Sequence, residues 1–180
     1  LIVVSLTHLG IRGASIYLLG NKKFDENPLV SSVVLILMGS GLVGMILSAA
    51  GFWIFQDNKF SIWLIVLVLF VIPLRLSIIY TGGIFLGKDE IKKANNLNWM
   101  INVLNLLLAI VLVWWLGYGL TGAVVATLLA NLYVAVRAMM LLARQFDLKL
   151  SYYPEIVKSL LRLGILFSMS FFVLQLNYKI

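Results

Sequence analysis

Six long, mainly apolar stretches constrain the fold of this chain more than any other feature. They cover roughly residues 1–19, 31–55, 61–86, 97–116, 120–142 and 159–178. A helix needs about 20 apolar residues to cross the hydrocarbon core of a bilayer. The strands of a membrane barrel would instead show segments of about ten residues with alternating hydrophobicity. We therefore expect an all-α fold, a polytopic transmembrane helical bundle of six helices.

The composition excludes most water-soluble classes of protein. Of the 180 residues, 62% are apolar and only 12% are charged, whereas a soluble domain carries about a quarter charged residues. Soluble enzymes and nucleic-acid-binding modules are therefore not expected. The chain has no cysteine and one histidine, which excludes disulfides, cysteine-ligated metals and histidine clusters. We expect no metal site and no cofactor.

The lysines and arginines predict the orientation in the membrane. Most of them lie in or beside the polar breaks near 20–28, 87–96 and 143–158: Lys22, Lys23, Lys88, Lys92, Lys93, Arg137, Arg144, Lys149, Lys158 and Arg162. The opposite side has only Lys59 and, at the far end, Lys179. Because basic residues concentrate in cytoplasmic loops, we expect these three breaks to be cytoplasmic. The aromatic residues expected at the outer interface are Trp53, Trp63, Trp114, Trp115 and Tyr118.

Arg75 is the clearest ionisable residue inside a predicted span. It precedes the loop at Gly87 by 12 residues, which is about 18 Å along a helix. An arginine at this depth costs at least a few kcal/mol unless it faces a partner or a wet cavity. Pro73 would leave carbonyls unpaired beside it. Arg75 is therefore either a cavity cation or an arginine satisfied by those carbonyls or by a neighbouring helix.

A second polar group lies in the first span. Ser5, His8, Arg12 and Ser15 are spaced by three, four and three residues, so they would share one face of a continuous helix. Such a face is expected to look into the bundle or an aqueous cavity. The alternative is a packing stripe of Ser and His with an arginine that extends toward the interface.

The fourth span carries uncharged polar residues, asparagines, at the same spacing of three, four and three residues. They are Asn95, Asn98, Asn102 and Asn105. Four aligned amides indicate either a wet wall that binds a ligand or hydrogen bonds between helices. For Asn95, close to the loop, we favour hydrogen bonding.

Small residues predict two packing faces. They are Ser40, Gly44 and Ser48 in the second span, and Gly122, Ala123, Ala126 and Ala130 in the fifth. Such residues let helix backbones approach closely.

The acidic residues are absent from the predicted spans. All seven lie in the polar breaks or beside them: Asp25, Glu26, Asp57, Asp89, Glu90, Asp147 and Glu155. Arg12 and Arg75 therefore lack an intramembrane acidic partner in this chain. Unpaired cations in a low-dielectric cavity attract an anion, and the planar fork of arginine suits phosphate. The same absence argues against a cation channel or a carboxylate proton site in this segment.

Two segments carry a resemblance to a known family. The stretch LGIRGASIYLLGNKK, residues 9–23, resembles the second helix of polysaccharide flippases in the multidrug/oligosaccharidyl-lipid/polysaccharide exporter superfamily. The stretch GYGLTGAVVAT, residues 117–127, is similar to the turn that opens their sixth helix. The resemblance covers essentially the whole chain, as helices two to seven of a two-bundle transporter.

This resemblance implies a division of the chain. Residues 1–143 would be five helices of the N-terminal bundle, without its first helix. Residues 144–158 would be a cytoplasmic linker, and residues 159–180 the truncated first helix of the C-terminal bundle. We interpret the chain as a fragment of a longer protein.

The resemblance also implies a function, without covalent chemistry. Such proteins flip polyprenyl-pyrophosphate-linked oligosaccharides across the plasma membrane of a bacterium or archaeon by alternating access, for export of polysaccharides such as O-antigen or capsule. The expected partners are this anionic lipid, the bilayer and the rest of the transporter. Our candidate cavity residues are Arg12, Arg75, His8, Asn98, Asn102 and Asn105.

Two alternatives stay open. One is a drug/cation antiporter of the same fold, which typically carries a membrane acid in the first helix, a region outside this sequence. The other is a membrane-embedded transferase. It needs an acid–base constellation of His, Asp or Glu, which the spans do not offer.

Overall fold

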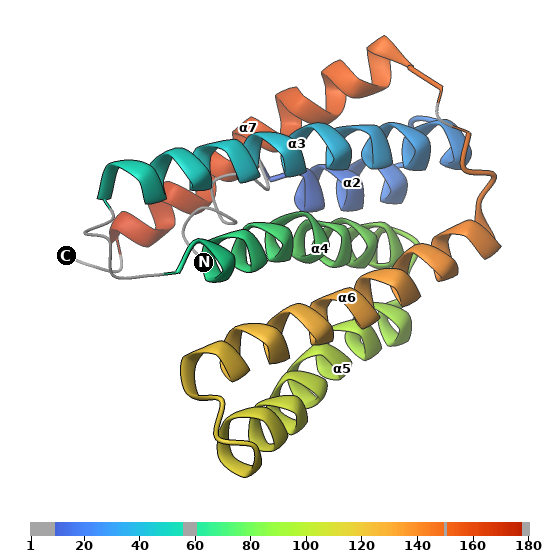
Figure 1. Ribbon diagram of the computed structural model, residues 1–180. Helices are drawn as coiled ribbons and strands as arrows, with labels where there is room; N and C mark the ends of the chain where they lie inside the picture. The colour runs from blue at the N-terminus through green and yellow to red at the C-terminus, as the bar shows by residue number, and fades with distance from the viewer. Residues whose placement is uncertain (1–9, 56–60, 150, 178–180) are drawn as a thin grey trace.

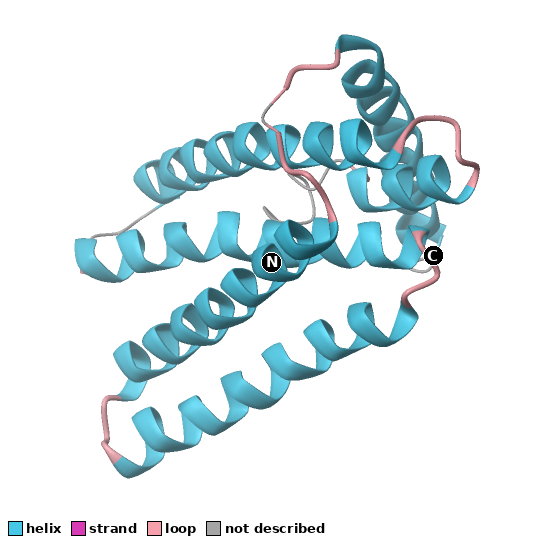
Figure 2. Ribbon diagram, turned by 90° about the vertical axis from the view of Figure 1, so that its right-hand side faces the viewer, coloured by secondary structure: helices cyan, strands magenta, loops and turns pink. Residues whose placement is uncertain are grey.

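The computed structural model describes residues 10–55, 61–149 and 151–177, and these residues form helices joined by short turns, without a strand among them (Figures 1 and 2). The helices are α2 (Ile11–Gly20), α3 (Glu26–Phe55), α4 (Ile62–Gly87), α5 (Ile91–Ala109) with its π-helical continuation η1 (Ile110–Trp115), α6 (Gly119–Gln145) and α7 (Pro154–Asn177). The all-α prediction is confirmed.

Helix α4 lies at the centre of the molecule. It packs against α2, α3, α5 and α6 (Figure 1). Its sequence is apolar all the way round, which is typical of a buried helix. Leu76, Ile84 and Phe85 of α4 are completely buried. The core therefore follows α4, while α7 packs across α2 and α3 at one side of the molecule.

Four helical segments of the described chain are long and apolar enough to cross a membrane. They are Glu26–Ile54, Ile62–Gly87, Ile91–Trp115 and Gly119–Gln145. These match the second to fifth predicted spans. The first predicted span lies partly outside the described residues, and α7 corresponds to the sixth.

Several helices extend beyond the apolar stretches that predicted them. Helix α3 begins at Glu26 rather than near 31, and α5 begins at Ile91 rather than near 97. Polar residues at a helix end still make the backbone hydrogen bonds of the helix, so hydropathy detects only the part that would contact lipid. The connection between α6 and α7 comprises residues 146–153. For the same reason it is shorter than the predicted linker, residues 144–158.

The prediction of one continuous helix over residues 1–19 is wrong at Gly10. This glycine has a left-handed backbone, with φ of 60°, and α2 begins only at Ile11. A Cβ at Gly10 would collide with the backbone oxygen of Gly164 in α7 and lie 3.0 Å from the Ser168 nitrogen. The start of α2 thus depends on contact with a helix about 150 residues further along the chain. A local sequence pattern cannot predict such a contact.

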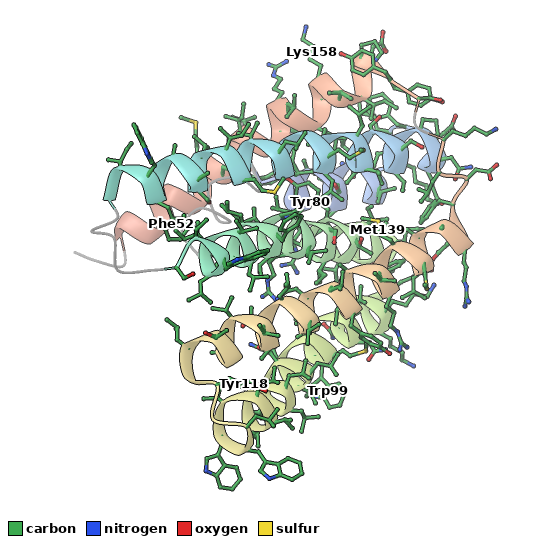
Figure 3. The ribbon with its side chains drawn as sticks, viewed as in Figure 1. Phe52, Tyr80, Trp99, Tyr118, Met139 and Lys158 are labelled. Carbon is green, nitrogen blue, oxygen red and sulfur yellow. The ribbon has the colours of Figure 1, made fainter. Side chains whose placement is uncertain are left out.

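The predicted packing faces are confirmed at most of their positions, although Ala123 of α6 is only half-buried. Ser40 and Ser48 of α3 are only 7% exposed, and Ala126 and Ala130 of α6 are completely buried. The Ser40 hydroxyl lies 3.2 Å from the Tyr80 hydroxyl. Figure 3 shows the Tyr80 side chain between α3 and α4. Small side chains therefore bring α3 and α6 close to α4, as expected for helices in a membrane bundle.

The polar breaks that carry the basic residues lie at one end of the bundle (right-hand side of Figure 1). Lys88 after α4 pairs with Glu26 of α3 at 2.6 Å. Lys93 of α5 pairs with Glu90 at 2.9 Å, and Gln145 of α6 donates to Glu90 at 2.6 Å. We call these residues the basic-end network. It joins α3 to α6 at this end, whereas its placement in the cytoplasm stays a prediction.

Candidate functional site

Arg75 lies in the middle of α4 and is half-buried. Its guanidinium makes no hydrogen bond or ion pair with the described chain. The alternative in which backbone carbonyls satisfy this arginine is therefore not what the structure shows. Helix α4 continues through Pro73 to Gly87. A half-buried cation without a partner is the most unusual charged group in the described part of the molecule.

The packing of α4 determines which way Arg75 projects. Pro73 lies against α3, because a Cβ at Gly41 would be 3.1 Å from the Pro73 Cβ. Tyr80 also faces α3, through its contact with Ser40. With about 100° per residue, Arg75 is about 160° around the helix from Pro73 and about 140° from Tyr80. Arg75 therefore projects from the side of α4 that faces away from α3.

Arg12 lies in the first turn of α2 and is exposed. Its backbone and stem rest on Gly83 of α4: a Cβ at Gly83 would be 3.1 Å from the Arg12 Cα and 3.0 Å from its Cγ. The Arg12 guanidinium has no hydrogen bond or ion pair with the described chain. Gly83 is eight residues beyond Arg75, which is about 12 Å along α4 and about 80° around it. Arg12 is thus nearer the basic end than Arg75.

The polar stripe of the first span has two members, Arg12 and Ser15, in the described part of the chain. Ser5 and His8 lie outside the described residues, so their side chains have no placement here. Helix α2 begins only at Ile11, directly after the left-handed Gly10. Ser15 is completely buried and donates to the Ile11 carbonyl at 2.8 Å. Of these two residues only Arg12 is exposed, so Ser15 does not line an open surface with it.

The asparagines of α5 divide into two groups. Asn95, Asn98 and Asn102 are exposed. Asn105 is half-buried and accepts a hydrogen bond from the Thr127 hydroxyl of α6 at 3.3 Å. Asn105 therefore takes part in hydrogen bonding between helices. Asn98 and Asn102 keep their amides free for another role.

Arg75 and Asn102 lie equally far along their helices from the turn that joins α4 and α5. Helices α4 and α5 are antiparallel and are joined by the turn at 88–90. Arg75 precedes Gly87 by 12 residues and Asn102 follows Glu90 by 12 residues, so each is about 18 Å from the turn.

A cavity of about 700 Å³ lies between α3, α4 and α6, and sequence reasoning missed it. Its lining is almost entirely apolar: Leu37, Met38, Gly41, Leu42, Met45, Pro73, Leu74, Ser77, Ala135, Val136, Met139, Met140 and Ala143. Because Pro73 lines it, the cavity lies on the side of α4 opposite to Arg75. It contains none of the predicted site residues. Four of the lining residues are methionines, and these could have indicated the cavity in the sequence, since methionine often lines adaptable apolar surfaces.

The charges of the described residues are separated along the bundle. The acidic residues that form ion pairs, Glu26 and Glu90, belong to the basic-end network. Within the described chain, no group of three or more His, Cys, Asp or Glu side chains could hold a metal ion. Arg12 and Arg75 are thus the charged groups without a partner on the described α2 and α4.

No family model matches this chain, and no curated protein matches it. Among solved structures, the chain is similar to a MOP superfamily transporter from Pyrococcus furiosus, for which a reverse polarity of the binding pocket suggests a different function. The TM-score is 0.74 and the identity 23%, over 93% of this chain and 41% of that one. At this identity the similarity establishes the fold. The chain spans less than half the length of that transporter.

Proposed function

We propose that this chain is part of a membrane transporter that moves a polyprenyl-pyrophosphate-linked oligosaccharide across the plasma membrane of a bacterium or archaeon. The fold of a MOP superfamily transporter supports the transport activity. The resemblance of residues 9–23 and 117–127 to polysaccharide flippases supports the substrate class. Alternating access between this bundle and a second one would move the substrate, without covalent chemistry.

The observation that carries the proposal is the unpaired guanidinium of Arg75 inside a helix long enough to cross a membrane. A cation at this depth is stabilised by an anion that enters from solution, and the guanidinium fork can bind a phosphate through two hydrogen bonds. A pyrophosphate supplies two such groups. A neutral or cationic substrate would leave Arg75 without a partner.

The two arginines suggest an order of contacts during transport. Arg12 is about 12 Å nearer the basic end than Arg75 along α4. A headgroup that enters from the basic end would meet Arg12 first and Arg75 afterwards. Asn98 and Asn102 would offer neutral hydrogen bonds to sugar hydroxyls on the exposed face of α5. His8 stays a candidate from the sequence alone.

The test uses the full protein that contains this chain, reconstituted in liposomes, with a polyprenyl pyrophosphate that carries a labelled sugar. We expect R75A and R12A each to weaken binding roughly 10- to 100-fold, the loss typical of one or two hydrogen bonds to a charged group. R75K should retain part of the affinity, because it keeps the charge but loses the fork. R137A is the matched control, since Arg137 is an exposed arginine on α6.

Two results would overturn the proposal. If R75A and R12A both bind and transport at the wild-type level, these arginines are not the binding groups. If the protein instead moves a cationic dye in exchange for sodium or protons and ignores the pyrophosphate lipid, the antiporter alternative is correct. Equal losses in R75A and R137A would point to a general effect of charge.

A further inference from the structure

The contact between α2 and α4 depends on two glycines of α4. A Cβ at Gly83 would lie 3.0–3.1 Å from the Cγ, Cα and carbonyl oxygen of Arg12. A Cβ at Gly87 would lie 2.8 Å from the Leu19 Cβ and 3.2 Å from the Ile16 Cα. Of the two, Gly83 is the one whose contacts are with the candidate binding residue.

The nature of the atoms at Gly83 decides what a larger side chain would do. Two of the three nearest atoms are backbone atoms of Arg12. A rotation of the Arg12 side chain therefore cannot relieve the contact with a Cβ at position 83. On the other side of α2, a Cβ at Gly13 would be 3.3 Å from the Phe167 ring of α7. Helix α2 is therefore held between α4 and α7. A methyl group at position 83 therefore requires the Arg12 backbone to shift by a few tenths of an ångström.

We infer that Gly83 is a positioning residue for Arg12. Its missing side chain lets the Arg12 stem lie directly on α4, so that the guanidinium emerges on the exposed side of α2 with its donors unused. The inference rests on the proposed function, in which Arg12 binds the anionic headgroup. It adds a residue that does not touch the substrate but determines where one of the binding cations lies.

A matched control lies next in the chain. A Cβ at Gly82 would meet nothing within 4 Å, although Gly82 is buried in the same helix. G83A and G82A therefore make the same chemical change one residue apart, one against Arg12 and the other into open space.

The experiment is a double-mutant cycle in the full reconstituted protein, with the labelled polyprenyl pyrophosphate as the probe. We expect G83A to weaken binding about three- to thirtyfold and G82A less than twofold. In the R12Q background, G83A should have less than a twofold further effect, because the cation it displaces is already absent. A purely structural role of Gly83 would give the same loss in both backgrounds.

The possible results separate this inference from the proposed function. The same G83A loss with Arg12 and with Gln at position 12, or wild-type binding in G83A, overturns only the inference. Wild-type binding in R12Q overturns the role of Arg12 and the inference with it.

A second comparison does not depend on the folding of G83A. R12M keeps a stem that can lie on Gly83 without a charge, whereas R12A removes both. We expect R12M to melt at the wild-type temperature and R12A to melt at a lower temperature, although both lose binding. Equal melting temperatures for R12M and R12A would show that the contact between the Arg12 stem and Gly83 does not stabilise the fold. This result would overturn the inference.

Discussion

At the scale of single residues, Glu90 links several helices at the basic end. Its carboxylate accepts a hydrogen bond from Gln145 at 2.6 Å and pairs with Lys93 at 2.9 Å. Partial burial would raise the pKa of Glu90, but the contacts with Lys93 and Gln145 and the charges of Lys93 and Lys88 hold the pKa below its ordinary value. The ionised form of Glu90 is therefore stabilised in the folded protein.

We expect E90Q to destabilise the protein by about 1 kcal/mol at pH 7. Because the folded-state pKa of Glu90 is lowered from 4.5, its stabilising effect is complete above that pH and is lost as the pH falls through the folded value. The difference in thermal stability between wild type and E90Q should therefore shrink under acidic conditions. E155Q, at the exposed start of α7, is the control. A difference that is independent of pH would contradict this account.

At the scale of elements, the connection between α5 and α6 is built around glycines. Helix α5 widens into the π-helical segment η1, and Gly117 and Gly119 take left-handed backbones, with φ of 70° and 52°. The Tyr118 amide donates to the Leu112 carbonyl at 3.1 Å. A Cβ at Gly122 would lie 2.8 Å from that same carbonyl oxygen. Gly122 thus allows the first turn of α6 to pack directly on η1.

We expect G122A to destabilise the protein by about 1–3 kcal/mol, because its methyl group would push against a backbone oxygen. G39A is the matched control: a Cβ there would meet nothing within 4 Å, and Gly39 is exposed within α3. Alanine favours a helix over glycine by about 0.5–1 kcal/mol, so G39A should be neutral or slightly stabilising. Thermal unfolding of both variants in detergent measures the difference. A loss in G39A equal to that in G122A would refute the packing explanation.

At the scale of the whole molecule, the two ends of the bundle differ in chemistry. One end carries the basic-end network, with Lys88 also lying 4.8 Å above the Phe146 ring. At the other end the large aromatic residues are exposed: Trp53 by 88%, Trp63 by 76%, Trp114 by 84% and Trp115 by 81%. This distribution is typical of a membrane protein whose basic end faces the cytoplasm and whose tryptophans lie at an interface.

The absence of cysteine from this chain makes the orientation directly testable. We expect a cysteine at Leu116 to react with a membrane-impermeant maleimide added outside intact cells. A cysteine at Lys92 should react only after the membrane is made permeable. Both residues are exposed and lie near opposite ends of α5 and η1. Any cysteine elsewhere in the protein is replaced first. The opposite labelling pattern would reverse the predicted orientation and leave the fold unaffected.

Much of the fold could be predicted because it depends on properties that act locally. The apolar runs within 31–55, 61–86, 97–116 and 120–142 all became helices, since a backbone without water must satisfy its hydrogen bonds internally. The small residues Ser40 and Ala126 were recognisable as packing positions for the same local reason. Helix ends were less predictable, because polar residues such as Glu26 continue a helix that hydropathy does not detect.

The candidate site was less accessible to sequence reasoning, because spacing gives a face only along an unbroken helix. Helix α2 begins only after Gly10, whose left-handed backbone lies against α7, and no local pattern predicts that start. Asn105 belongs to the same spacing pattern as Asn102, yet its side-chain oxygen accepts a hydrogen bond from Thr127 of α6. The apolar cavity beside Met139 is lined by residues of three helices, α3, α4 and α6, so no single stretch of sequence could indicate it.

The order of residues alone was enough to show that this chain forms membrane-length helices, which of their ends carry the basic residues, and that Arg75 lies far from either end of its helix. Hydrophobicity and charge act on each segment separately, so these features can be predicted without knowing which helices pack against one another. Three further features depend on how the helices pack: Arg12 rests on Gly83, Arg75 projects away from α3, and the apolar cavity lies on the opposite side of α4. Those features arise from contacts between residues far apart in the chain, where close packing leaves one arrangement.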